Sequence, residues 1–367
     1  CGIVGGLWKN NNNSEHLLQC ALDKIAHRGP DDSGYQINFL DDLVVALGHT
    51  RLSIIDLTEA GHQPMFSNDG RWSIVFNGEI YNYKEIRIEL EIAGFKFLSN
   101  TDTEVLLYSW VYWGENCLNR FSGMFSFVIY DQLNNTMFVA RDAFGIKPFF
   151  YVLNNEYFYF SSEIKALREL LPHKPSLNMQ SYYDYLVHGD YDSNSETFYN
   201  DVNHLPPGHF LKINILNLEF VEPKRWCFPL TKINAAWDFN DAVKKVRDEF
   251  LENVRLHLRC DVPLGATLSG GVDSSAVVCA IRYLEPNLPI HTFSFIADDS
   301  DVNEEYWIDR INSHVNAVPH KVSLRSEELV KDINCVVETQ GEPFGSTSIY
   351  AQYRVYKLAH EKGIKVI

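Results

Sequence analysis

The sequence predicts an α+β region followed by an α/β region with a doubly wound parallel sheet. Up to about residue 205, short β-type runs are separated by turn signals and only a few helical patterns occur. From about residue 240, strand and helix patterns alternate, which is typical of parallel strands joined by helices. Prolines concentrate between these two regions. We therefore expect two domains, at 1–205 and 236–367, joined by a linker at 206–235.

The first region is predicted to open with a buried strand at Ile3–Trp8, because this run is almost entirely apolar. Helical periodicity predicts helices at Glu15–His27, Tyr83–Ala93 and Thr103–Gly114, the last with Thr101 or Asp102 as its N-cap. Runs of β-branched and aromatic residues predict further strands at Leu43–Leu47, Trp72–Phe76, Phe125–Tyr130, Met137–Ala140, Phe149–Leu153 and Tyr157–Ser161.

The second region alternates between the two types of element. Strands are predicted at Gly265–Leu268, Ile290–Phe295, Pro319–Val322 and Ile364–Ile367. Helices are predicted at Asn240–Arg259, Ser274–Leu284, Glu304–Val315, Ser326–Thr339 and Ser346–Lys362. Because the sequence stops inside an apolar run suited to a central parallel strand, we expect a fragment, a processed chain or a missing C-terminal part.

The composition argues against several classes of protein. The net charge is −16, from 32 basic and 48 acidic residues, and no basic run of five or more residues occurs, so we expect no binding to nucleic acid or to membranes. The seven cysteines are scattered and show no C-x-x-C spacing, which argues against a disulfide framework or a zinc site. No run reaches the roughly 18 apolar residues of a membrane span and no signal peptide is present, so we expect a cytoplasmic location.

Cys1 combines a thiol and a free α-amino group on one carbon. The ordinary pKa of an α-amine is about 8 and that of a thiol about 8.5. Part of the amine is therefore unprotonated at neutral pH, and it can accept the thiol proton directly or through one water. This is a nucleophile and its base within one residue, and the predicted strand that follows would hold the pair in place.

A second chemical motif is Ser269-Gly270-Gly271-Val272-Asp273-Ser274-Ser275, between a predicted strand and a predicted helix. Its glycines allow close approach of a ligand, and the N–H groups at the helix start form an anion site with the serine hydroxyls. The motif lacks the lysine of the P-loop, so transfer of a γ-phosphate is not indicated. It resembles the PP-loop of ATP pyrophosphatases, which split ATP into AMP and pyrophosphate.

Cys1 and this loop, in this order, resemble the glutamine-hydrolysing asparagine synthetase family. Members join a class II glutamine amidotransferase domain to a synthetase domain. The resemblance covers essentially the whole sequence and implies an Ntn-type αββα sandwich followed by a doubly wound sheet of the adenine nucleotide α hydrolase type. Further matching segments are Arg28–Asp31, Arg51–Asp56, Asn77–Asn82, Arg141–Pro148, Ser161–Ala166 and His257–Pro263.

The resemblance implies a role for each residue of a glutaminase site. Cys1 is the nucleophile, and the side-chain amide of Asn77 and the backbone N–H of Gly78 form its oxyanion hole. Arg51 binds the glutamine α-carboxylate, and two acidic residues bind the α-amino group. The implied glutamine-binding residues are Arg51, Leu52, Ile54, Ile55, Asn77, Gly78, Glu79 and Asp102.

For the second region, the resemblance implies a site for Mg-ATP. Leu268 and Phe295 are implied to contact adenine, and Glu338 to participate in forming an acyl-adenylate. Mg²⁺ is expected because it neutralises phosphate charge with few protein ligands, which the sequence does not identify. The implied ATP-binding residues are Leu268, Ser269, Gly270, Gly271, Val272, Asp273, Ser274, Ser275 and Phe295.

The reaction implied by the resemblance is the synthesis of asparagine. Glutamine is hydrolysed at Cys1, and ammonia passes through an internal channel to β-aspartyl-AMP, which forms from ATP and aspartate. A homodimer is the family's habit. The family's second glycine-rich loop is missing, and the segment 342–347 departs from the better-known members. Two alternatives stay open: amidation of another carboxylate, such as a sugar uronic acid, or a glutaminase with a nucleotide-binding module that performs no synthesis.

Overall fold

The computed structural model describes residues 1–10, 13–191, 193–218, 222–228, 237–297 and 303–367. It divides into two compact units with separate hydrophobic cores. The first unit comprises Cys1–Leu230 and Gly341–Pro343, and the second comprises Thr231–Gln340 and Phe344–Ile367. No described helix is both long and apolar enough to cross a membrane.

The first unit contains two six-stranded antiparallel sheets. The strand order of one sheet is β10-β8-β9-β1-β3-β2, and that of the other is β12-β11-β7-β6-β5-β4. The strands of the first sheet are β1 (Gly2–Lys9), β2 (Asp32–Leu40), β3 (Leu43–Arg51), β8 (Phe150–Leu153), β9 (Phe158–Ser161) and β10 (Asn203–His204). Those of the second are β4 (Met65–Phe66), β5 (Trp72–Ile80), β6 (Gly123–Asp131), β7 (Thr136–Arg141), β11 (His209–Asn214) and β12 (Lys224–Arg225).

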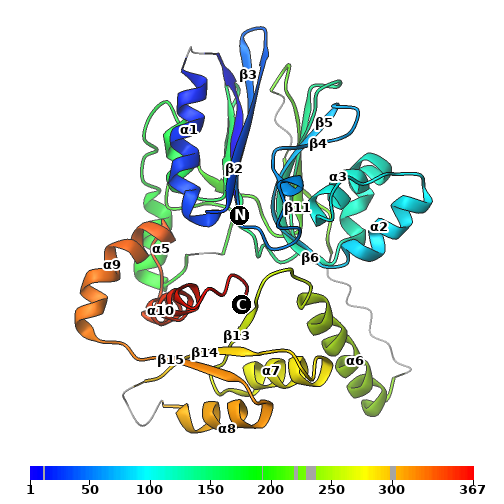
Figure 1. The fold of residues 1–367 in the computed structure, drawn as a ribbon. Helices are drawn as coiled ribbons and strands as arrows, with labels where there is room; N and C mark the ends of the chain where they lie inside the picture. The colour runs from blue at the N-terminus through cyan, green and yellow to red at the C-terminus, as the bar shows by residue number, and fades with distance from the viewer. Residues whose placement is uncertain (11–12, 192, 219–221, 229–236, 298–302) are drawn as a thin grey trace. The chain divides into compact units, whose positions relative to one another are not determined.

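The two sheets stack face to face and carry helices on their outer faces (Figure 1). In β1, Ile3 and Leu7 pack between the sheets, whereas Val4 and Trp8 pack against the outer helices, as the two-residue period of a strand requires. The αββα sandwich predicted for this part of the chain is therefore confirmed. The helices are α1 (Ser14–Ile25) and α4 (Ile164–Leu170) on the first sheet, α2 (Tyr83–Ile92) and α3 (Asp102–Trp113) on the second, and α5 (Met179–His188).

The segment 206–235, which the sequence predicts as a linker, contributes the strands β11 and β12 to this sandwich. Within it, β11 pairs with β7, and Ile213 and Ile215 are buried between the sheets. Pro207 and Gly208 form a turn. The N–H of Gly208 donates to the carbonyl of Asp142 at 2.7 Å and ties this turn to the sandwich. Residues 219–221 and 229–235 lie outside the described residues.

The second unit is built on a parallel sheet of β13 (Gly265–Thr267), β14 (His291–Phe295) and β15 (Val318–Val322), in that order. The strand expected at Ile364–Ile367 is reduced to a parallel bridge at Val366, whose carbonyl accepts from the N–H of Gly265 at 2.8 Å. The helices are α6 (Phe239–His257), α7 (Val272–Leu284), α8 (Glu305–Val315), α9 (Ser326–Gln340) and α10 (Ser348–Glu361).

Helices cover both faces of this parallel sheet. Val278 of α7 and Ile308 of α8 are buried on one face, and Val355 of α10 packs on Phe293 on the other. The doubly wound sheet is therefore confirmed. From β13 the chain continues to β14 and β15 on one side of β13, and it then returns to pair at Val366 on the other side. The end of β13 is therefore a topological switch point, where ligands bind in such sheets.

Candidate active site

The α-amino terminus at Cys1 is held by hydrogen bonds directly before the start of β1. The α-amine of Cys1 donates to the carbonyl of Arg28 at 2.9 Å, and Nε of Arg28 donates to the carbonyl of Cys1 at 2.9 Å. The Arg28 guanidinium also bonds Glu163 at 2.8 Å. Although burial opposes it, hydrogen bonds from His27 and Arg28 lower the pKa of Glu163 to about 2, so it stays ionised. This network keeps the terminus from fraying.

The α-amine of Cys1 is neutral at physiological pH. Burial, followed by the positive charges of Arg28 and Lys147, lowers its pKa from 8.0 to about 4. The Sγ atom of Cys1 lies 3.4 Å from the backbone nitrogen of Leu52, which donates to it, and 3.7 Å from the carbonyl oxygen of Leu52. A thiol and an unprotonated amine therefore share one residue, which is the pairing expected of an activated nucleophile.

A pocket lies beside Cys1. The structure brings eight predicted residues together in its lining: Cys1, Arg51, Leu52, Ile54, Ile55, Gly78, Glu79 and Asp102. Asn77 is buried in β5 directly before Gly78 and does not belong to this lining. Its side-chain nitrogen is buried and has no hydrogen-bond partner among the described residues.

Arg51 places a fixed positive charge in the wall of the pocket. Its guanidinium donates to the carbonyls of Thr58 at 2.7 Å and Ile55 at 3.3 Å, and also to that of Asp56. The loop after β3 therefore wraps around this cation. Gly61 completes the wrap, because a Cβ there would lie 1.9 Å from the guanidinium. Such a held guanidinium is suited to bind a carboxylate.

Two buried carboxyl groups, Glu79 and Asp102, line the same pocket. Burial raises the pKa of Asp102 to about 6, against the opposing hydrogen bond from the Ile80 N–H at 2.9 Å. Burial and the neighbouring Asp102 raise the pKa of Glu79 well above its usual range. One oxygen of Glu79 has no hydrogen-bond partner among the described residues. Burial outweighs the opposing effects of Lys147 on the pKa of Glu79 and of Arg51 on that of Asp102, so an α-ammonium group beside this pair would be stabilised.

The backbone of β5 leaves an N–H group open toward this pocket. On β6, Phe125 lies opposite Gly78 and exchanges its own backbone hydrogen bonds with Asp142 on the far side. Gly78 therefore forms no ladder bonds with β6, and its N–H points to the other edge of β5. On that edge β4 begins at Met65, which pairs with Ile74, so β4 does not extend as far as Gly78. This N–H is therefore directed away from the β5–β6 ladder.

The loop between β13 and α7 leads directly into an uncapped helix start, a feature suited to an anion. Gly271 is the N-cap of α7 and no side chain caps the helix, so N–H groups of the first turn stay open. The Ser269 hydroxyl accepts from the N–H of Gly271 at 3.2 Å and lies 3.0 Å from the Ser274 hydroxyl. Gly270 has a φ of +88°, a conformation that favours glycine.

Three other predicted residues of the second unit differ widely in their surroundings. Leu268 is only 1% exposed and packs in the core with α7 and α8. Phe295 is half-buried at the end of β14, and Glu338 is exposed on α9. The described residues contain no group of three or more metal-ligating side chains. The adenine, acyl-adenylate and Mg²⁺ assignments therefore stay predictions.

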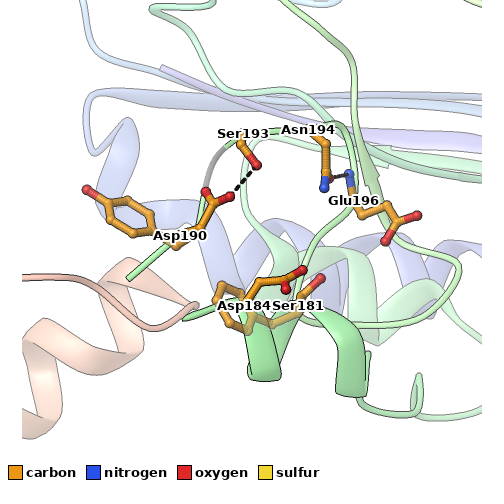
Figure 2. A pocket seen from close by; sticks show the side chains of 8 residues that line it. Ser181, Asp184, Asp190, Ser193, Asn194 and Glu196 are labelled. Atoms are coloured by element: carbon orange, nitrogen blue, oxygen red, sulfur yellow. Dashed lines mark hydrogen bonds between the residues drawn. The ribbon is translucent and has the colours of Figure 1, made fainter. Parts of the chain in front are cut away.

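A second pocket of the first unit contains no predicted residue (Figure 2). Its carboxylates belong to α5 and the loop that follows. Ser193 donates to Asp190 at 2.7 Å, and the Glu196 N–H donates to Asn194 at 2.7 Å. These bonds stabilise the loop itself, and no chemical role follows from them. The lining residues are Ser181, Asp184, Asp190, Tyr191, Ser193, Asn194, Glu196 and Phe198.

Sequence reasoning assigned no role to several residues that build the site. Arg28, Lys147 and Glu163 lie in segments that match the family's motifs, and this match is a usable sequence signal. Gln63 gave no local signal, because its function depends on contacts with distant segments. The lining residues that were missed are Gly61, Gln63, Phe76, Thr101 and Thr103.

Comparisons with known proteins agree with this geometry. Residues 1–226 match the glutamine amidotransferase domain family, and residues 245–367 match the asparagine synthase family. Glutamine-hydrolysing asparagine synthetase 3 of Bacillus subtilis is 31% identical over 94% of this chain and 57% of its own length. A putative glutamine-hydrolysing asparagine synthetase 2 of Methanocaldococcus jannaschii is 31% identical over 98% of this chain and 72% of its own length.

A further relative has a different name. Amidase chry2 of Gibberella zeae is 29% identical over 95% of this chain and 53% of its own length. The chain thus spans little more than half the length of two of these three relatives. The two family matches and the coverage of the Methanocaldococcus jannaschii relative are sufficient to assign the family. The chain belongs to the glutamine-hydrolysing asparagine synthetase family.

Proposed function

We propose that the first unit hydrolyses glutamine to glutamate and ammonia. The observation that carries the proposal is the pocket beside Cys1, where a neutral amine accompanies the thiol. Arg51 faces it as the partner of an α-carboxylate, and Glu79 and Asp102 as the partners of an α-ammonium. A free amino acid carries both charges on one carbon, so its side chain can extend from this clamp to the thiol.

The proposed reaction uses Cys1 as nucleophile, base and acid. The thiol proton moves to the α-amine while Sγ bonds to the carbonyl carbon of the glutamine side-chain amide. The N–H of Gly78 and the amide of Asn77 stabilise the resulting oxyanion. When this intermediate collapses, the C–N bond breaks, and the amine's proton leaves with nitrogen as ammonia. Water, deprotonated by the amine, then hydrolyses the thioester, which releases glutamate and restores the thiol.

We propose that the second unit consumes this ammonia in an ATP-dependent amidation. The open N–H groups at the start of α7 and the hydroxyls of Ser269 and Ser274 are suited to hold phosphate groups of ATP. The acceptor carboxylate, aspartate in the leading proposal, attacks the α-phosphorus and releases pyrophosphate. Ammonia then replaces AMP to give asparagine. Mg²⁺ needs few protein ligands, and Asp273, the carboxylate of this loop, would hold it together with the nucleotide phosphates, whose charge the ion would neutralise.

A different acceptor is the second candidate. The name of the amidase relative and the departure of segment 342–347 from the family pattern both favour considering it. The two half-reactions stay the same, and the carboxylate changes.

Isotope exchange between ATP and pyrophosphate, measured with a panel of carboxylic acids, tests this proposal. We expect exchange that depends on aspartate, together with glutamine hydrolysis. The matched control is Gly270→Ala, which strains a positive φ and brings a Cβ within 3.1 Å of Glu304. This variant should lose exchange and keep hydrolysis. Exchange driven by another acid would replace aspartate as acceptor, and hydrolysis without any exchange would refute synthesis.

A further inference from the structure

We infer that His49 and Gln63 are positioning residues for the oxyanion hole, because together they clamp the Phe76 backbone beside Gly78. The inference rests on the proposed hydrolysis of glutamine at Cys1. Gln63 accepts from the N–H of Phe76 at 2.7 Å, and Nε2 of His49 bonds the carbonyl of Phe76 at 3.0 Å. Both side chains are buried, with exposures of 3% and 0%.

The clamp replaces a strand that would otherwise cover the oxyanion donor. Backbone groups of Phe76 and Gly78 point to the same edge of β5, since strand residues alternate. A longer β4 would satisfy Phe76, but it would also bond the N–H of Gly78 and remove it from the pocket. Side chains from other segments bond Phe76 alone. The edge is therefore rigid at Phe76 and open at Gly78.

His49 also links the sheet of the nucleophile to the sheet of the oxyanion donor. It lies in β3, opposite Ile3 of β1, and Thr50 pairs with Gly2 next to Cys1. Its bond to Phe76 crosses to β5 of the other sheet. The separation between Cys1 and Gly78 thus depends on this hydrogen bond. Transition-state stabilisation requires donors at a fixed distance from the attacked carbonyl, so a small shift between the sheets is costly.

The chemistry of His49 fits a fixed donor rather than a proton carrier. A carbonyl only accepts, so Nε2 must carry the hydrogen and Nδ1 is left with a lone pair. Nδ1 is buried and has no partner among the described residues. Burial, the nearby chain terminus, Arg51 and His62 hold the pKa of His49 well below its usual range, despite the bond to Phe76. The ring therefore stays neutral in one tautomer.

Gln63 is held in turn by α3. Its side-chain nitrogen donates to the hydroxyl of Thr103 at 3.3 Å, in the first turn of that helix. The first residue of α3 is Asp102, which accepts from the N–H of Ile80 two residues beyond Gly78. The open N–H of Gly78 is thus flanked on both sides by backbone groups that buried side chains hold.

Kinetics of His49→Leu in the purified protein test the inference. We expect kcat for glutamine hydrolysis to fall by about 10²-fold to 10³-fold, the usual effect of a lost oxyanion donor, with KM changed less than about threefold. Alkylation of Cys1 by iodoacetamide needs no oxyanion hole, so its rate should stay within about threefold of wild type. His49→Gln keeps an N–H donor and should recover much of kcat.

Gln63→Leu gives a second kinetic test, which does not depend on correct folding of the His49→Leu variant. It should reproduce the loss of kcat with the same unchanged alkylation rate. A kcat within about threefold of wild type in both leucine variants would overturn the inference. A fall in kcat that is accompanied by a similar rise in KM and a similar fall in the alkylation rate would also overturn it, because such changes indicate general unfolding. Hydrolysis that persists in Cys1→Ala would instead refute the proposed function, so the two failures are distinguishable.

Discussion

One extra residue ahead of Cys1 is expected to abolish glutamine hydrolysis. The α-nitrogen would become an amide, which has no basic lone pair, and the added residue would occupy the buried space where the amine bonds Arg28. Loss of the general base alone costs up to about 10⁴-fold. Ammonia release from glutamine, measured for the extended and the processed protein, gives the comparison.

The control restores the terminus without changing anything else. A protease site placed before Cys1 allows the same preparation to be assayed before and after cleavage. Cleavage should return full activity. The ATP–pyrophosphate exchange of the second unit should be equal in both forms, since the loop before α7 is untouched. Wild-type hydrolysis by the extended form would show that the amine is not the base.

Cys1→Ala is expected to lose glutamine-dependent activity completely and to keep any ammonia-dependent synthesis. No other group in the pocket can form the thioester, and removal of a covalent nucleophile costs on the order of 10⁶-fold. Ammonia from solution bypasses this step. Product formation with glutamine or ammonium salts as nitrogen source separates the two activities.

Cys335→Ala is the matched control, because Cys335 is an exposed thiol on α9 in the second unit. It should hydrolyse glutamine at the wild-type rate. Glutamine-driven product from Cys1→Ala would assign the nucleophile to another residue and undo the proposed mechanism.

Local signals predicted much of the fold. Helix positions depend on neighbours in the sequence, and the predicted cap at Thr101 is present, where its hydroxyl accepts from the N–H of Glu104 at 3.1 Å. Cys1 and the loop at 269–275 were found because their chemistry lies within a few consecutive residues. The alternation of strands and helices after residue 240 predicted a parallel sheet, and the structure confirms it.

Features that depend on distant contacts were not predictable. β2 is half-exposed along its length and its sequence lacks a clear apolar pattern, so it gave no strand signal. β11 was hidden in a proline-rich segment because its pairing with β7 is a long-range event. His49 and Gln63 acquire a role only when two sheets and α3 meet around Phe76. No spacing along the chain reveals that meeting.

The pH dependence of glutamine hydrolysis tests whether the buried α-amine of Cys1 is the general base of the reaction. With an amine pKa of about 4, the base form dominates from about pH 5 upward, so kcat at pH 6 should lie within about twofold of kcat at pH 8. KM should rise below about pH 6, as Asp102 is protonated and loses its attraction for the α-ammonium of glutamine. An ordinary amine with a pKa near 8 would instead give a roughly 50-fold fall in kcat from pH 8 to pH 6, and that result would refute the buried-base mechanism.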